Sequence, residues 1–115
     1  ESSEETIVQI SHEEVSEDEL NSVIKRFNNQ NNPALSLFIA KTYYDRGNYK
    51  EAYNYALVTN NLNPSIEDSV LIFARSLVKL GKKEDAITTL EAYINNTGSI
   101  NAKILLNEIQ KGKFK

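Results

Sequence analysis

The side chains that could carry out chemistry are few, and they gather near the N-terminus. His12 is the single histidine of the 115 residues, and it lies beside Glu13 and Glu14. Imidazole and carboxylate groups can act in acid–base catalysis or bind a metal ion, but both roles need partners held on rigid elements. The carboxylates here also lack the alternating, glycine-containing pattern of a calcium loop. We therefore expect no catalytic residue and no metal site in this segment.

No other combination of residues predicts an enzyme. Cysteine is absent, which removes disulfides, thiolate metal ligands and thiol catalysis together. The four glycines all fall at expected turns or helix ends, so none of them indicates a phosphate-binding loop. Because no nucleophile–base pair, metal-ligand set or cofactor loop is visible, we expect a protein that is not an enzyme and takes no cofactor.

Composition and charge exclude further classes of function. Hydrophobic residues make up 40% of the chain and charged residues 25%, which is typical of one soluble domain. The formal net charge of −3 gives no reason to expect a nucleic-acid partner. No apolar run approaches about 18 residues, so we expect no membrane span. The sequence starts at Glu1 and contains no Met, which indicates a fragment from which a domain, a signal peptide or a membrane anchor was removed upstream.

Helical patterns run through most of the chain after a polar start. Residues 1–15 are expected to form a flexible acidic arm, because they are acidic and polar with one short apolar stretch at Ile7, Val8 and Ile10. Ser16, with Glu19 three residues later, has the spacing of a capping box and predicts a first helix over 16–29. Further helices are expected over 34–46, 49–60, 66–80, 83–95 and 99–112. These patterns predict an all-α domain over 16–115.

Two stretches of the chain match each other at an offset of 34 residues. Ala40, Gly47 and Ala52 of the first stretch recur as Ala74, Gly81 and Ala86 of the second. Small residues repeat at a fixed period when helices must approach closely at the same place in successive units. Short turns at the glycines force neighbouring helices to run antiparallel, so each unit is predicted to be a helical hairpin.

This repeat resembles the tetratricopeptide repeat, a helix–turn–helix unit of about 34 residues. With units over 33–66 and 67–100, Ala40 and Ala74 match the small position of the first helix, and the glycines match the turn. Both units are degenerate, because Ser36 and Val70 stand at the family's usual tryptophan position. The resemblance implies a short helical-hairpin solenoid of about six helices. Helices 16–29 and 99–112 are expected to act as caps on its two ends.

The resemblance also implies a binding surface. In tetratricopeptide proteins the first helix of each unit lines a groove that receives peptides or partner helices. Lys41 and Arg75 are 34 residues apart, so they are expected to be neighbours along this groove and, with Lys79, to form a positive patch. Such a patch suits an acidic or carboxylate-ended peptide. The matching groove positions are Leu37, Lys41, Tyr44 and Asp45 in the first unit and Asp68, Leu71, Arg75, Val78 and Lys79 in the second.

The groove has alternative interpretations. The three cations could simply keep a helix face solvated. The groove could also receive the protein's own arm around Ile7–Ile10, or a neighbouring copy of the chain. A different hypothesis for the whole domain is a self-assembling oligomeric scaffold, formed by stacked repeats or through the N-terminal arm.

The sequence therefore predicts a non-catalytic protein–protein interaction module that binds a peptide or partner segment in its groove. The Asn- and Lys-rich character and the missing start favour a bacterial protein, similar to small repeat domains of envelope, secretion or pilus-type assemblies. We expect a cell-envelope or periplasmic location if an upstream anchor was removed, and a cytoplasmic location otherwise. The sequence does not identify the partner.

Overall fold

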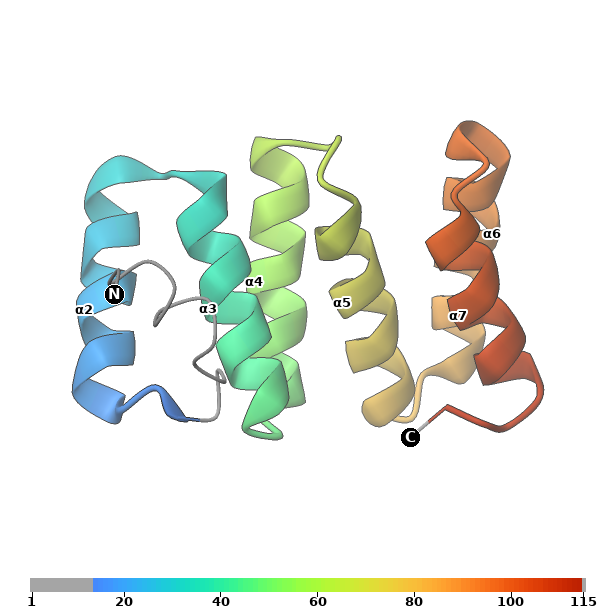
Figure 1. Cartoon of the computed structure of the whole chain (residues 1–115), viewed down its shortest axis with the longest axis horizontal. Coiled ribbons are helices and arrows are strands. Elements are labelled where there is room, and N and C mark those ends of the chain that lie inside the picture. The colour runs from blue at the N-terminus through green and yellow to red at the C-terminus, as the bar shows by residue number, and fades with distance from the viewer. Residues whose placement is uncertain (1–13, 115) are drawn as a thin grey trace, which may run out of the picture.

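The computed structural model describes residues 14–114, which form six helices in a row (Figure 1). There is no strand in this part of the chain, so the predicted all-α fold is confirmed. Each helix boundary lies within two residues of the predicted one. His12 and most of the predicted arm lie outside the described residues. The helices are α2 (Glu17–Gln30), α3 (Pro33–Asp45), α4 (Tyr49–Leu62), α5 (Glu67–Lys79), α6 (Lys83–Thr97) and α7 (Ile100–Gln110).

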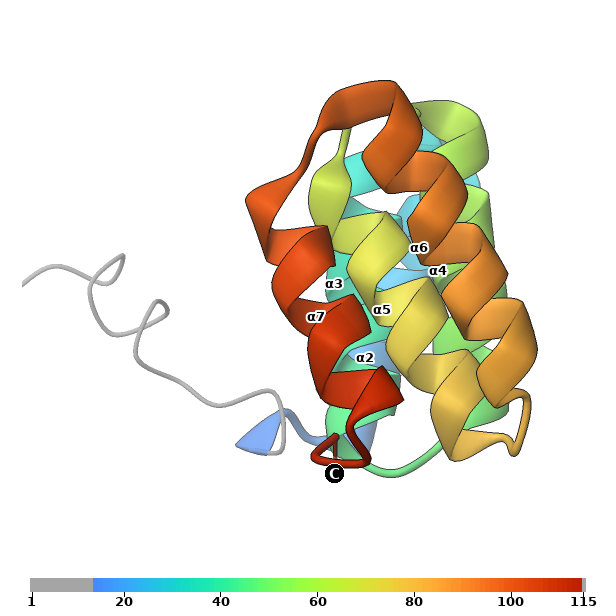
Figure 2. The ribbon, with the colours of Figure 1, turned by 90° about the vertical axis from the view of Figure 1, so that its right-hand side faces the viewer.

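The helices stack as hairpins in two layers. Every helix contacts the next one along the chain, and α5 also contacts both α3 and α7. Figure 2 looks along the row and shows α7 on one side of α5 and α6 on the other. Helices α3, α5 and α7 therefore share one face of the molecule, which we call the groove face. This arrangement is that of a short helical-hairpin solenoid, as predicted.

Polar side chains cap the N-termini of the first two helices. The backbone N–H of Glu19 donates to the Ser16 hydroxyl at 3.1 Å, and the Ser16 N–H donates to the Glu19 carboxylate at 2.8 Å. These two bonds confirm the predicted capping box. Asn31 ends α2 with a φ of 52°, and the Asn32 side chain caps α3 by accepting from the N–H of Ala34 at 2.8 Å.

The turns of the two hairpins have the same backbone conformation and the same closing hydrogen bond. Gly47 has a φ of 81° and Gly81 has a φ of 82°, a left-handed conformation that glycine adopts without strain. The residue after each glycine donates its N–H to the carbonyl five residues earlier, at 2.9 Å in the first turn and 2.8 Å in the second. The 34-residue offset is thus a repeat of backbone geometry as well as of residue type.

Small residues fill the contact between the helices of each hairpin. Ala40, Ala52 and Ala56 in the first hairpin, and Ala74 and Ala86 in the second, are completely buried. Side chains that end at Cβ let two helix backbones lie close together, and close packing leaves no room there for larger groups. These alanines therefore fix how the two helices of each hairpin pack.

Two buried polar residues, one on α3 and one on α4, depart together from the repeat pattern. Ser36, at the usual tryptophan position, and Thr59, at the later small position of the second helix, are both fully buried. Their hydroxyl oxygens lie 2.6 Å apart. Each hydroxyl also lies near a carbonyl of its own helix, that of Pro33 at 3.1 Å and that of Tyr55 at 2.8 Å. A hydrogen-bonded polar pair thus replaces an aromatic contact between α3 and α4.

Aromatic contacts join neighbouring hairpins. The Tyr55 ring stacks on Tyr43 with centroids 5.9 Å apart and meets Phe27 edge-on at 6.3 Å. These rings hold α2, α3 and α4 together, so α2 packs as part of the core. The Tyr53 and Phe73 rings stack at 4.6 Å and connect α4 with α5. Pairs of this kind contribute about 0.5–1.5 kcal/mol beyond their buried area.

A carboxylate joins the starts of α5 and α7. Glu67 accepts hydrogen bonds from the Ser99 hydroxyl and from the Asn101 amide, the latter at 2.9 Å. Ser99 also caps α7, because its hydroxyl accepts from the N–H of Ala102 at 3.0 Å. The bonds from Ser99 and Asn101 hold the pKa of Glu67 below its ordinary value of 4.5. This bonding favours the ionised carboxylate in the folded protein.

The alanine contacts yield a first prediction. Replacing Ala74 with Leu overpacks a fully buried helix contact, and we expect the free energy of unfolding to fall by about 1–3 kcal/mol. Ala34→Leu, at an exposed position of α3, is the matched control and should change the free energy by less than about 0.5 kcal/mol. Urea denaturation followed by circular dichroism measures both. Equal stability of Ala74→Leu and the wild type would show that the repeat register is wrong.

The Glu67 contact predicts a pH dependence. Because its pKa is lowered on folding, the ionised carboxylate stabilises the fold above pH 4.5, and this contribution is lost as the pH falls through the folded-state pKa. The wild type should therefore melt above Glu67→Gln at pH 7, and the difference should be smaller at pH 3. Glu91→Gln, at an exposed position of α6, is the control and should follow the wild type. A melting difference that persists unchanged at pH 3 would contradict the assignment.

Candidate functional site

A cavity of about 430 Å³ opens on the groove face between α3 and α5. We call this cavity the groove. Successive turns of α3 supply one wall and successive turns of α5 the other, while a residue that follows α7 completes the lining. The lining residues are Lys41, Tyr44, Asp45, Asp68, Ile72, Arg75 and Phe114.

Five of the nine predicted groove residues line this groove. Lys41 and Arg75 lie on facing walls, and Tyr44 and Asp45 continue the α3 wall. Asp68, the fifth, lies on the α5 wall, and the other four predicted residues lie elsewhere. Leu71 is buried in the core, Leu37 and Val78 pack against the hydrophobic clusters, and Lys79 lies near Phe114 outside the lining.

Two lining residues were not among the predicted groove positions. Ile72 lies four residues after Asp68 and three before Arg75, so the helical period alone places it on the same face. Phe114 gives no such signal. The chain reverses after α7 at Gly112, whose φ is 70°, and this reversal brings Phe114 to the groove. The sequence after α7 has no counterpart in the repeat that could have predicted this position.

The charges in the groove are mixed. Lys41 forms an ion pair with Asp68 at 3.0 Å, and the two side chains are 35% and 53% exposed. An exposed pair of this kind is worth less than about 1 kcal/mol, so it exchanges readily. Arg75 forms no ion pair within residues 14–114. Burial raises the pKa of the Tyr44 hydroxyl, and the positive charge of Arg75 acts on it in the opposite sense.

Aromatic rings surround one end of the groove. The Lys79 ammonium lies 5.6 Å from the centre of the Tyr49 ring and 5.5 Å from that of Phe114. Tyr49 in turn meets Tyr44 edge-on, with centroids 5.2 Å apart. Cation–π contacts therefore hold Phe114 against the end of α5. The groove thus has an aromatic end, with the Lys79 ammonium beside it, as well as charged walls.

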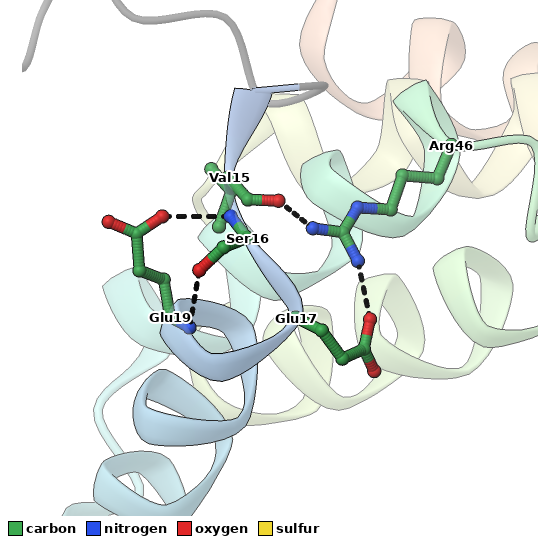
Figure 3. A network of polar contacts seen from close by, with 5 residues as sticks. All are labelled: Val15, Ser16, Glu17, Glu19 and Arg46. Atoms are coloured by element: carbon green, nitrogen blue, oxygen red, sulfur yellow. Dashed lines mark hydrogen bonds and ion pairs between the residues drawn. The ribbon is translucent and has the colours of Figure 1, made fainter.

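A separate contact fixes the start of α2 against the end of α3 (Figure 3). Arg46 donates to the Glu17 carboxylate at 3.0 Å and, with its other terminal nitrogen, to the backbone carbonyl of Val15. Arg46 directly follows Asp45, which lines the groove. The chain that enters α2 is thereby tied to the end of α3, and we call this contact the anchor.

The described residues contain neither a metal-ligand group nor a membrane-spanning helix. Within 14–114 there is no group of three or more His, Cys, Asp or Glu side chains that could hold a metal ion. None of the helices in this range combines the length and the apolar character that crossing a bilayer requires. The arrangement of the helices is that of a helical-repeat protein with a groove on one face.

The family assignment agrees with this geometry. Residues 22–93 match the sequence model of the family described as anaphase-promoting complex, cyclosome, subunit 3. The match covers more than half of the chain, so the chain belongs to this family of tetratricopeptide-type repeats. The predicted resemblance to tetratricopeptide repeats is therefore confirmed. No curated protein and no solved structure matches the chain.

Proposed function

We propose that this chain is a non-catalytic protein–protein interaction module that binds an acidic peptide segment in the groove. The observation that carries the proposal is Arg75, a cation that has no ion pair within residues 14–114 and faces a peptide-sized cavity. Membership of a tetratricopeptide-type family supports the general role, because such repeats generally act as interaction modules.

Different residues of the groove contact different parts of the bound peptide. Arg75 can receive a peptide carboxylate through two parallel hydrogen bonds, and the neighbouring Tyr44 hydroxyl can donate a third. Lys41 can turn from Asp68 to a second carboxylate at little cost, because their ion pair is exposed. An apolar side chain of the peptide would lie against Phe114 at the aromatic end of the groove.

A second candidate function, self-assembly, is favoured by one surface. Ile100 and Ile104 lie one turn apart on α7, the last helix of the row, and are 71% and 53% exposed. A second copy could cover these side chains by packing its own α7 against them. The origin in a bacterial envelope assembly remains a prediction of the sequence.

The groove proposal is tested by charge reversal. A random dodecamer peptide library is selected on the wild-type protein, and we expect the retained peptides to be rich in Asp and Glu. The double variant Lys41→Glu/Arg75→Glu should bind these peptides at least about tenfold more weakly, equivalent to about 1.4 kcal/mol, as measured by fluorescence anisotropy.

The control variant makes the same change of charge at two positions outside the groove. Lys50→Glu/Lys83→Glu alters two exposed lysines on α4 and α6 and should bind within about twofold of the wild type. Circular dichroism should show both variants folded and melting near the wild type. Equal weakening by both pairs, or selection of peptides without acidic residues, would count against the groove.

The self-assembly candidate predicts a concentration dependence. If copies associate through α7, sedimentation velocity should show a mass that rises with protein concentration, and Ile100→Ser/Ile104→Ser should abolish the rise. Leu57→Ser, at another exposed apolar position, is the control and should leave it intact. A monomer throughout the concentration series would rule out self-assembly as the main role.

A further inference from the structure

The anchor determines where the N-terminal segment begins. Arg46 holds the Val15 carbonyl and the Glu17 carboxylate, and Asp45 next to it lines the groove. Val15, the second described residue, is therefore held at the end of α3, and α3 supplies one wall of the groove.

The segment is long enough to cross the groove. A chain extends by up to about 3.3 Å per residue, so thirteen residues can span about 40 Å. The longest dimension of the molecule is itself 40 Å. A partly extended segment can therefore reach Arg75 from the anchor, and its tethering sets a local concentration on the order of millimolar.

The chemistry of the segment complements that of the groove. Residues 1–13 contain no Lys or Arg, and their apolar residues lie between acidic ones. Carboxylates on both sides can pair with Arg75 and Lys41, while the apolar stretch between them can lie against Phe114. The acidic residues are Glu1, Glu4, Glu5 and Glu13, and the apolar ones are Ile7, Val8 and Ile10.

We infer that residues 1–13 bind in the groove of their own chain and compete there with an external acidic peptide. The inference rests on the proposed function, because both use the same groove. An internal competitor lowers the apparent affinity for a partner in proportion to its occupancy. A partner of higher affinity, or a change in the charge of residues 1–13, then opens the site.

The first experiment places a probe on the segment of the full chain. The sequence has no cysteine, so Gln9→Cys provides a unique position for a nitroxide spin label between Val8 and Ile10. In a ¹⁵N-labelled sample the label should broaden the amide signals of Tyr44 and Arg75. It should leave those of Asn54 and Glu91, on α4 and α6, sharp.

Two controls make the result specific. Adding Lys41→Glu/Arg75→Glu to the labelled chain should remove the broadening, while Lys50→Glu/Lys83→Glu should retain it. Mixing spin-labelled unenriched chains with unlabelled ¹⁵N chains should give none, since the contact is within one molecule. Broadening in the mixed sample, equal broadening on both faces, or none at the groove would overturn the inference.

A second measurement separates this inference from the proposed function. Replacing Glu1, Glu4, Glu5 and Glu13 by Gln should raise the affinity for a library-selected acidic peptide about threefold, as expected if the segment occupies the groove two-thirds of the time. Unchanged affinity without broadening refutes the inference while the proposed function stands. Broadening at the groove in the wild type, together with no retention of library peptides by the Glu→Gln variant, shows that residues 1–13 bind in the groove and refutes the proposed function.

Discussion

The close contact of paired helices at alanine is the constraint on which the rest of this structure depends. Ala40 and Ala74 are completely buried at equivalent places, so α3 and α5 must present the same face in each hairpin. Lys41 directly follows Ala40, and Arg75 directly follows Ala74. Each cation therefore has the same position relative to the buried alanine of its helix and points away from the contact between the paired helices. Both side chains consequently line the same groove. The proposed binding surface is thus a consequence of how the core packs.

The repeated turns maintain this geometry where the repeat is otherwise degenerate. The two glycine turns share their backbone conformation and their closing hydrogen bond, and so they give both hairpins the same entry into the second helix. Ser36 and Thr59 show how a lost aromatic position is tolerated, because the two hydroxyls satisfy each other inside the core. Such local compensation lets sequence positions diverge while helix packing stays fixed.

The fold could be predicted from the sequence because it depends on local and periodic signals. The capping box at Ser16, the turn glycines and the alanine period each act over a few residues or at a fixed spacing. The groove was predictable only in part. The pairing of Lys41 with Asp68 depends on side-chain conformations across two helices, and the position of Phe114 depends on a reversal that has no counterpart in the repeat. Ile72 could have been found from the helical period alone.

The mixed charge of the groove has a consequence for how it would act. Two carboxylates among the lining residues offset its two cations, so long-range attraction for an acidic segment is weak and recognition must come from short-range contacts. Arg75 can form such contacts at once, whereas Lys41 must first leave Asp68. A groove of this kind favours a tethered or otherwise concentrated ligand over a dilute one. A segment attached beside the α3 wall meets that requirement, and an external partner would need additional contacts to replace it.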